Sequence, residues 1–481
     1  MSRSTALSEP DDWSQLVAEF HRGPARVCLA ITGGGISAAS QLLTVPGASR
    51  TILDVQVPYH SQALQSLLGR APEQYCSLPT ALQMASVACR QAVHLLKEDG
   101  SWTDANAANR GFPVGVGCTA ALVSDRPKKG AHRAWIAIQT PCETWAAELV
   151  LTKGLRSRAA EDELVGRLIL SLLFAASKHL PAADDVPAAD SPALNAPTAD
   201  APVAISPVTQ ASGTCVRSDD ESEETAGVQS APTTGVNTSI PWPELEQRLT
   251  APSDGPNLPL VETDQLRIQR LAASVPLQQL WAGHRPVVWS QADRLSTISP
   301  WPSGPQAILS GSFNPLHHGH REILEIARRR CGPQIAGELS IQNVDKPPLD
   351  FLSLRERCRQ FEELPVALTA QPKFVDKAML FPGTVFLIGW DTAVRLLQDR
   401  YNGGQPGDTA RTLQQIRAQG CRFLVFGRAE SSHSSDAAFR TLESCSLPAE
   451  FADLFEQVDE AEFRADISST ALRRAGDSTG S

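Results

Sequence analysis

The sequence predicts an α/β protein made of two α/β domains joined by a disordered linker. Three observations lead to this fold class. The chain has 481 residues, more than one hydrophobic core usually holds. Short apolar runs alternate with helical stretches in its C-terminal half. Between residues 181 and 240 the composition becomes rich in Pro, Ala, Ser and Asp. We therefore expect domains at residues 1–180 and 257–481, with a linker at 181–256.

The segment 181–240 carries most of the negative charge of the chain. It holds nine acidic side chains and a single arginine, which accounts for eight of the ten net negative charges. Such a segment cannot bury enough apolar surface to offset the entropy lost on ordering, so we expect it to be disordered. The rest of the chain is near neutral, which argues against nucleic-acid or membrane-surface partners. Residues 257–305 regain apolar side chains and are expected to pack against the C-terminal domain.

The apolar runs of the C-terminal half are short and largely uninterrupted, as is typical of strands buried on both faces. We expect strands at residues 307–309, 339–341, 384–388 and 423–426, with helices at about 353–364 and 408–419. This alternation predicts a doubly wound parallel sheet that binds ligands beyond the carboxyl ends of its strands. Gly311, Gly389 and Arg428 each lie just beyond such an end.

The most informative segment is Gly311–His320, with the sequence GSFNPLHHGH. His317 and His320 lie three residues apart at the start of an amphipathic helix, so both imidazoles can face one phosphate. The N–H groups of the first helical turn favour the same anion, and Gly311 lets the backbone come close to it. Two other interpretations are a loop with clustered histidines and a metal site. The motif contains no Cys, Asp or Glu at ligand spacing, which disfavours the metal site.

A second segment, Ile467–Arg473 (ISSTALR), lies near the C-terminus. The two segments resemble the paired signatures of the HxGH type of the nucleotidylyltransferase superfamily, which includes nicotinamide-nucleotide, phosphopantetheine and nicotinate-nucleotide adenylyltransferases. The resemblance implies a Rossmann-like doubly wound sheet. It also implies that His317 and His320 bind the phosphates and stabilise the transition state, with Mg²⁺ bridging the leaving pyrophosphate. His318 occupies the variable position of the motif.

The same resemblance implies further contacts. Asp391, in Gly389-Trp390-Asp391, matches a G-x-D element that hydrogen-bonds the sugar or base side of the nucleotide. Trp390 either stacks on a base or lies in the core or rim. Asn343 and Lys346 resemble a stretch that meets the substrate phosphate, with a surface lysine as the alternative. The implied nucleotide-binding residues are Gly311, Ser312, Phe313, Asn314, Gly389, Asp391, Ser468, Ser469, Thr470 and Arg473. The hydroxyl cluster among them is typical of a helix N-cap, and a plain cap is its other interpretation. No protein ligand to a metal is implied.

Five segments of the N-terminal half share one layout: Thr32–Gly35 (TGGG), Leu42–Ser49 (LLTVPGAS), Val57–Tyr59 (VPY), Pro113–Ala120 (PVGVGCTA) and Ala134–Gln139 (AWIAIQ). They resemble the C-terminal domain of CinA, the nicotinamide-nucleotide amidase family, over residues 27–178. That family has a nucleophilic serine where this chain has Ala30, and a lysine where it has Leu64. Tyr59 is retained. Without the nucleophile and the lysine, we expect no amide hydrolysis.

This resemblance implies a catalytically degenerate pocket around Ala30, Thr32, Gly33, Gly34 and Tyr59. A glycine-rich turn before a helix can still cradle a phosphate. Both halves resemble families that handle nicotinamide mononucleotide, so one hypothesis is that the first 180 residues bind this nucleotide saturably. A structural or dimerising domain is the equal alternative, which leaves homo-oligomerisation open.

Three functions remain. The first is transfer of a nucleoside monophosphate from ATP to a phosphorylated acceptor, with nicotinamide mononucleotide as the best candidate and NAD synthesis or salvage as the purpose. The second is the same transfer from CTP. The third is a non-catalytic nucleotide sensor or scaffold. The expected partners are therefore a nucleoside triphosphate and a phosphorylated small molecule, with neither nucleic acid nor membrane.

The sequence shows no targeting or membrane-spanning pattern. Its first ten residues are polar, and its most apolar stretch, Leu164–Ala176, is too short to span a bilayer and contains Arg167. The ten cysteines include no C-x-x-C pair, so neither a zinc site nor a disulfide framework is indicated. We expect a cytoplasmic protein.

Overall fold

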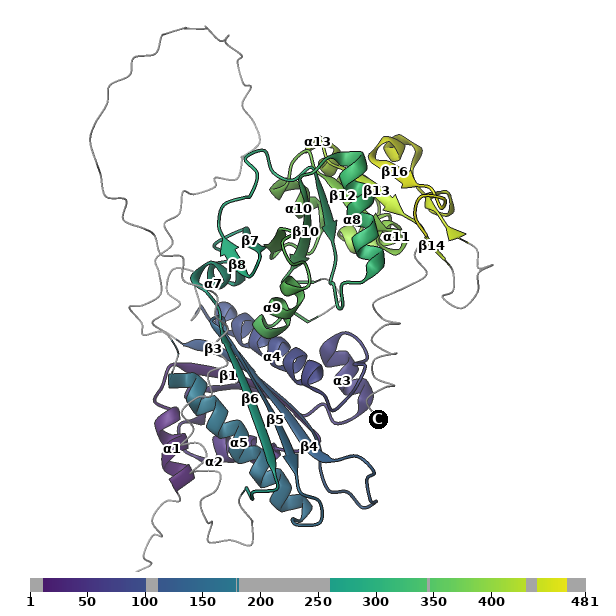
Figure 1. The fold of residues 1–481 in the computed structure, drawn as a ribbon. Coiled ribbons are helices and arrows are strands. Elements are labelled where there is room, and N and C mark those ends of the chain that lie inside the picture. Colours follow the sequence, from purple (N-terminus) through teal and green to yellow (C-terminus); the bar gives the residue numbers. More distant parts are fainter. Residues whose placement is uncertain are drawn as a thin grey trace, which may run out of the picture.

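The computed structural model describes two mixed α/β units, each built on one main sheet (Figure 1). It describes residues 12–100, 111–178, 180, 260–343, 347–429 and 439–464. The predicted linker at 181–256 lies outside these residues. Within them, no helix combines the length and the apolarity needed to cross a membrane.

The first sheet has six strands in the order β2-β1-β3-β4-β5-β6. Its strands are β1 (Ala25–Thr32), β2 (Ile52–Gln56), β3 (Phe112–Ala121), β4 (His132–Gln139), β5 (Glu143–Leu151) and β6 (Gln265–Ala272). Its helices are α1 (Asp12–Phe20), α2 (Ile36–Thr44), α3 (Ser61–Leu68), α4 (Leu78–Glu98) and α5 (Arg158–Lys178), with a 3₁₀ turn η1 (Ala48–Arg50). Strand β1, next to the edge strand β2, runs parallel to β2 and β3, and the remaining pairs are antiparallel. Helices α1, α2 and α5 cover one face, while α3 and α4 cover the other.

Strand β6 corrects the expected domain boundary. The sequence placed residues 257–305 with the C-terminal domain, whereas β6 pairs with β5 from Glu143 opposite Ala272 to Val150 opposite Gln265. The alternating sequence QLRIQRLA explains this position, because Leu266 and Ile268 pack against the first core while the intervening polar side chains are exposed. The two sheets are therefore separated after residue 272, not at residue 256.

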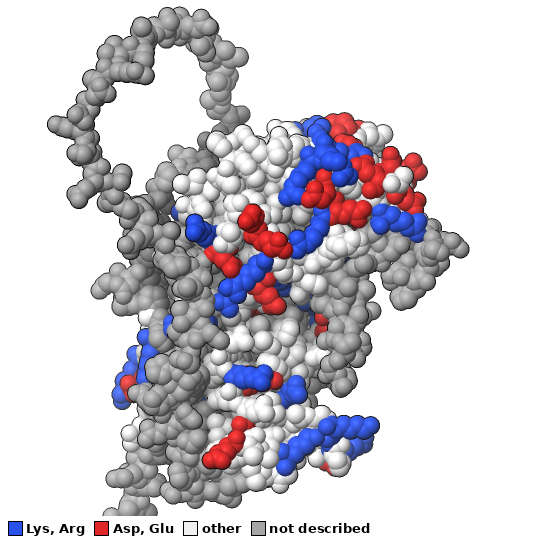
Figure 2. Space-filling model, viewed as in Figure 1, with Lys and Arg blue, Asp and Glu red and all other residues white. Residues whose placement is uncertain are grey.

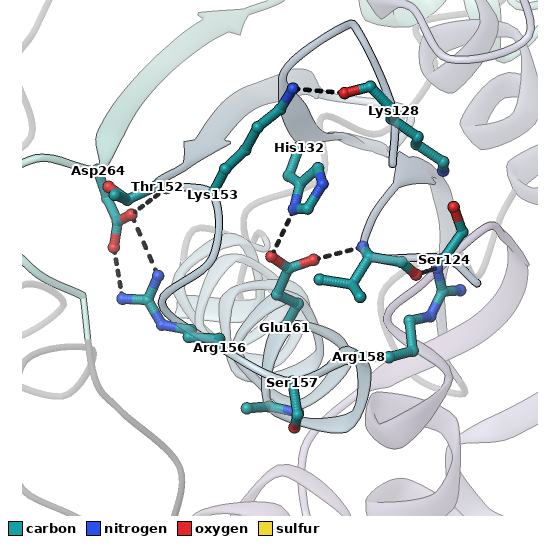
Figure 3. Close-up of polar contacts among 12 residues, drawn as sticks. Ser124, Lys128, His132, Thr152, Lys153, Arg156, Ser157, Arg158, Glu161 and Asp264 are labelled. Atoms are coloured by element: carbon teal, nitrogen blue, oxygen red, sulfur yellow. Dashed lines mark hydrogen bonds and ion pairs between the residues drawn. The ribbon is translucent and has the colours of Figure 1, made fainter. Parts of the chain in front are cut away.

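Buried polar contacts hold the chain where it enters β6 (Figure 3). The Asp264 carboxylate accepts hydrogen bonds from two nitrogens of Arg156 at 2.6 and 3.2 Å and from the backbone N–H of Thr152 at 2.8 Å. Burial acts to raise the pKa of Asp264, but these hydrogen bonds outweigh it, and the pKa is lowered. Beside them His132 bonds Glu161 on α5, with 2.8 Å between Nδ1 and Oε1. The start of β6 is thus fixed to the first domain.

The second sheet has eight strands in the order β16-β13-β12-β9-β10-β11-β7-β8. Its strands are β7 (Val287–Gln291), β8 (Arg294–Ser296), β9 (Ala307–Ser310), β10 (Ile335–Ser340), β11 (Val366–Thr369), β12 (Val385–Gly389), β13 (Arg422–Phe426) and β16 (Phe455–Val458), and a separate ribbon pairs β14 (Arg428–Ala429) with β15 (Phe439–Arg440). Six strands run parallel, and β7 and β8 add an antiparallel edge. The predicted doubly wound parallel sheet is confirmed.

Helices cover both faces of the second sheet. They are α7 (Val275–Trp281), α8 (His318–Cys331), α9 (Phe351–Arg359), α10 (Phe374–Leu380), α11 (Trp390–Leu396), α12 (Asp399–Asn402) and α13 (Asp408–Ala418), with 3₁₀ turns η2 (Leu442–Ser444) and η3 (Ala449–Leu454). Helices α8 and α9 pack on one face, and α10, α11 and α13 pack on the other. Helix α9 begins two residues before its predicted start because the buried Asp350 caps it, accepting from the Ser353 N–H at 2.8 Å.

Basic and acidic side chains lie side by side on the surface of the second domain (Figure 2). Arg330, at the end of α8, pairs with Glu456 at 2.7 Å and also with Glu462. Arg329 lies 3.6 Å from Glu462, and Arg328 pairs with Glu325. The arginine triplet that ends α8 is therefore neutralised by carboxylates rather than forming an open basic patch.

Candidate functional site

The strand order of the second sheet marks one place for a ligand. From β9 the chain moves outward to β10 and β11, and then returns to the other side of β9 to form β12, β13 and β16. Open α/β sheets bind ligands at such a switch point, in the crevice beyond the carboxyl ends of the two neighbouring strands. Gly311 directly follows β9, and Gly389 is the last residue of β12. Because Leu309 pairs with Leu387, the two glycines predicted from sequence lie at neighbouring strand ends.

The loop after β9 is built around a buried aromatic ring. Phe313 has a φ of 41° and is 1% exposed. A non-glycine residue in this region is strained, and packing must hold it there. Its ring meets Phe361 and His320 edge-on, with centroids 4.7 and 5.3 Å apart. A Cβ on Gly311 would lie 2.8 Å from this ring, so the glycine makes room for Phe313.

The two motif histidines lie together where α8 begins. His317 is the N-cap residue, and its backbone N–H donates to His320 Nδ1 at 3.2 Å. The imidazole rings stack with centroids 3.7 Å apart and 24° between their planes. Because Nδ1 of His320 accepts a hydrogen bond, the hydrogen of its neutral ring is assigned to Nε2. The Nδ1 atom of His317 is buried without a hydrogen-bond partner among the described residues.

Burial keeps both imidazoles neutral. Desolvation, followed by the proximity of His317, lowers the pKa of His320 to about 3. Desolvation, followed by the proximity of His318, also lowers the pKa of His317. At pH 7 the site therefore offers neutral hydrogen-bonding groups at a helix N-terminus rather than two cations. A bound polyphosphate would act in the opposite direction, because nearby negative charge favours the protonated form.

The predicted G-x-D element lies where the neighbouring strand β12 leads into α11. Gly389 is exposed with open space around its Cα, and the Asp391 carboxylate pairs with Arg428 of β14. Both charged side chains are about half exposed, at 49% and 52%. The Trp390 indole N–H donates to Ser444 Oγ at 2.9 Å, and the guanidinium of Arg440 covers its ring at 4.8 Å. Trp390 therefore contacts the segment that follows β15, and stacking on a base stays a prediction.

The second predicted signature is not placed. Lys346 and the set Ser468, Ser469, Thr470 and Arg473 lie outside the described residues, so their contacts stay predictions. Asn343 is described and exposed, three residues beyond β10. Ser312 is half-buried and Asn314 is exposed, and the peptide bond between Asn314 and Pro315 is cis.

Three of the five residues predicted to form a pocket in the first domain, Thr32, Gly33 and Tyr59, line a cavity in the structure. This cavity of about 300 Å³ lies at the carboxyl end of β1. It is lined by Thr32, Gly33, Pro58, Tyr59, His60, Ser61, Leu64, Tyr75, Cys76, Thr119 and Ala120, a set without Lys, Arg, Asp or Glu. Ala30 and Leu64, which stand where the amidase family has serine and lysine, are each 2% exposed and share one apolar cluster with Leu68 and Met84. The two side chains lie in the same cluster, where they pack as apolar core residues.

The expected phosphate cradle of the first domain is closed. The Asp162 carboxylate of α5 accepts hydrogen bonds from the backbone N–H groups of Gly35, Ile36 and Ser37 at 2.7, 3.3 and 3.1 Å. A carboxylate at a helix N-terminus meets the same donors and dipole that a phosphate would use. In the described structure these N–H groups therefore already bind an anion that the chain itself supplies.

Sequence reasoning missed three residues that shape the second site. Arg428 pairs with Asp391, although it was noted only as lying beyond a strand. Arg357 Nη1 donates to the Ser312 carbonyl at 2.9 Å, and Gln360 Nε2 donates to the Phe313 carbonyl at 3.1 Å. The spacing of Arg357 and Gln360 indicates one face of a predicted helix. It does not indicate which loop that face meets.

Comparison with known proteins adds a family for the second domain. Residues 308–475 match the model of the family described as Cytidylyltransferase-like. No curated protein matches the chain.

Three solved structures are similar to about a third of the chain. The competence/damage inducible protein CihA from Agrobacterium tumefaciens is 19% identical, with 35% of this chain and 98% of that chain covered and a TM-score of 0.26. A CinA superfamily protein from Escherichia coli is 16% identical, with 36% and 95% covered and a TM-score of 0.27. The competence damage-inducible protein A from Klebsiella pneumoniae is 13% identical, with 36% and 100% covered and a TM-score of 0.26.

The family match extends over the loop after β9, the paired histidines and the strands on both sides of the switch point. The match of residues 308–475 to the cytidylyltransferase-like model supports a function of the nucleotidyltransferase type.

Proposed function

We propose that the chain transfers a nucleoside monophosphate from ATP to a phosphorylated small molecule, with nicotinamide mononucleotide as the first acceptor to test, and releases pyrophosphate. The observation that carries the proposal is the pair of stacked, neutral histidines at the start of α8, beyond the carboxyl end of the switch-point strand β9. A catalyst of this transfer needs donors aimed at one phosphate more than it needs a nucleophile of its own.

The transfer is a single displacement at the α-phosphorus. An oxygen of the acceptor phosphate forms a bond to that phosphorus while the bond to the β-phosphate oxygen breaks, and pyrophosphate leaves with that electron pair. An acceptor phosphate is already largely ionised at pH 7, so no side chain has to remove a proton. His320 Nε2–H and the N–H groups at the start of α8 would donate to the non-bridging oxygens, where charge builds up.

Mg²⁺ fits this proposal as part of the substrate. The described residues contain no group of three or more His, Cys, Asp or Glu side chains that could hold a metal ion. Mg²⁺ commonly binds through substrate phosphates with few protein ligands, so it would arrive with the triphosphate. Bound there, it would neutralise charge on the leaving pyrophosphate.

The family description keeps CTP as the second nucleotide, and the decisive experiment compares both. Purified full-length chain is given Mg²⁺, ATP or CTP, and nicotinamide mononucleotide, and pyrophosphate and products are measured by mass. His320→Ala runs in parallel, with His318→Ala as its matched control because His318 is exposed and occupies the variable position of the motif. We expect dinucleotide from ATP, with turnover about 100- to 1,000-fold lower in His320→Ala and near normal in His318→Ala.

Other outcomes separate the alternatives. A cytidine product would show that CTP rather than ATP is the substrate, and the proposed reaction class would stand. Triphosphate binding without product from any phosphorylated acceptor tried would instead support the non-catalytic sensor. Ammonia release from nicotinamide mononucleotide would contradict the proposal that the first domain has lost amide hydrolysis.

A further inference from the structure

The loop that carries the proposed nucleotide contacts is held by the end of one helix. Gln360, the C-cap residue of α9, donates through Nε2 to the Phe313 carbonyl at 3.1 Å and accepts from the Leu316 N–H through Oε1 at 2.6 Å. One turn earlier, Arg357 donates to the Ser312 carbonyl at 2.9 Å. Three backbone groups around the strained Phe313 therefore depend on where α9 lies.

The other end of α9 is docked into the first domain (Figure 1). The Phe351 N–H donates to Thr144 Oγ1 of β5 at 3.0 Å, and the Thr144 hydroxyl donates to Gln139 Oε1 of β4 at 2.6 Å. Thr144 is fully buried. This short chain of hydrogen bonds crosses from the second domain into the first sheet, with the Thr144 hydroxyl acting as both acceptor and donor.

Apolar packing reinforces the same contact. Leu352, only 8% exposed, belongs to one cluster with Ala81, Leu82 and Ala85 of α4 and with alanines of β4 and β5. The small side chains of the first domain leave space that the leucine fills. A helix rises 1.5 Å per residue, so the docked end and the loop-holding end of α9 are only roughly 10 Å apart.

We infer that the first domain serves as a positioning partner for the triphosphate-binding loop, acting through α9. Arg357 and Gln360 hold the loop, Thr144 and the pocket for Leu352 hold the helix, and the rigid helix connects them. This inference rests on the proposed function for its effect on catalysis, but its structural part can be measured without turnover. According to this inference, the first domain contributes to nucleotide binding in the second domain without contacting the nucleotide.

The test breaks the docked end without touching the nucleotide site. Thr144→Val removes the hydroxyl at constant shape, Thr144→Ser keeps it, and Thr51→Val is the matched control. Thr51 is a buried threonine bonded to His21 at 2.5 Å, at the start of β2, four strands from β5. Each full-length variant is examined for hydrogen exchange in residues 311–317 and for KM and kcat with the triphosphate.

We expect Thr144→Val to speed exchange in the loop and to raise KM for the triphosphate about tenfold, with kcat changed less than about threefold. Thr144→Ser should restore both values, and Thr51→Val should lower stability without moving either. Gln360→Leu, at the other end of the helix, should reproduce the rise in KM. If Thr144→Val loses stability as Thr51→Val does while loop exchange and KM stay at wild-type values, the inference is overturned.

The exchange measurement separates this inference from the proposed function. If the wild-type chain turns over no triphosphate but Thr144→Val still loosens residues 311–317, the coupling stands and the proposed function fails. If turnover is confirmed and the loop does not respond to Thr144→Val, the function stands and the coupling fails.

Discussion

Helices α2 and α8 each follow a glycine-containing turn at the end of a parallel strand, and the two turns meet different partners. In the first domain, β1 leads through Gly33–Gly35 into α2, and the Asp162 carboxylate accepts from the first N–H groups of that helix. In the second domain, β9 leads through Gly311 into α8, and two neutral histidines stand at the helix start. One turn is closed by the chain itself, while the other presents hydrogen-bonding groups to a ligand.

This difference shows that a glycine-rich turn before a helix does not by itself define a phosphate site. The backbone donors and the helix dipole are present in both places. Whether such a turn can bind a phosphate depends on whether a distant side chain already supplies an anion to it. Asp162 lies 127 residues from Gly35 in the sequence, which is why the local pattern could not reveal it.

The largest effect is expected from adding a methyl group to each turn. In Gly33→Ala the new Cβ would lie 2.0 Å from the Ala120 carbonyl oxygen, at a φ of 76° that disfavours L side chains. We expect a loss of about 3 kcal/mol in the free energy of unfolding, measured by chemical denaturation of the full chain. In Gly311→Ala the Cβ would meet only the edge of the Phe313 ring, at 2.8 Å, so the loss should be smaller.

The comparison has a control in Gly389→Ala, where nothing lies within 4 Å of the added Cβ. Its stability should equal that of the wild type within roughly 0.5 kcal/mol. Equal losses in Gly33→Ala and Gly311→Ala would contradict the claim that only the first turn is packed against rigid backbone.

A smaller effect is expected from removing the internal anion. Asp162→Ala leaves three N–H groups of α2 without their acceptor, so we expect a loss of about 2 kcal/mol in unfolding free energy. The vacated helix start should then take up an anion from solution. Sulfate should therefore raise the melting temperature of Asp162→Ala more than that of the wild type. An identical response to sulfate in both proteins would show that the turn is no latent anion site.

The last effect is gradual rather than a single loss, and it concerns pH at the second turn. The pKa of His320 is lowered to about 3 in the folded protein, against about 6.5 in an unfolded chain. Below pH 6.5 the unfolded state binds a proton that the folded state does not, so the stability contributed by the neutral ring is lost as pH falls toward 3.

Wild-type stability should consequently fall more steeply with acid than that of His320→Gln, by less than about 1.4 kcal/mol per pH unit for a single proton. Denaturation midpoints between pH 7 and pH 4 measure this difference. Superimposable profiles would mean that His320 is protonated equally in both states.

The parallel core of the second domain could be predicted because its signals are local. Runs such as Phe423–Phe426 are short, apolar and separated by helical stretches, which favours buried strands of a parallel sheet. The histidine pair was predictable for the same reason, since three-residue spacing at a helix start fixes a common face. The neutral state of the two histidines could not be predicted, because it depends on their burial by residues such as Phe313.

What escaped prediction depends on contacts between distant segments. Strand β6 has the alternation of an edge strand, yet its sequence does not state which sheet it joins. The hydrogen bonds of Gln360 with Leu316 and Phe313 join residues that are 44 and 47 positions apart in the sequence. A fragment of residues 1–180, the apparent first domain, would lack β6 and leave the edge of β5 unpaired. Binding studies on the first domain therefore need β6.

The position of β6 also has a consequence for how the chain folds during synthesis. Val150 and Gln265 are neighbours in the finished sheet, but 114 residues separate them along the chain. Such a pairing closes a long loop late, after its entropy cost has been met by other contacts. A ribosome that has released residues 12–178 has made every other strand of the first sheet. We expect the edge of β5 to stay unpaired in the nascent chain until β6 has been synthesised and can pair with it.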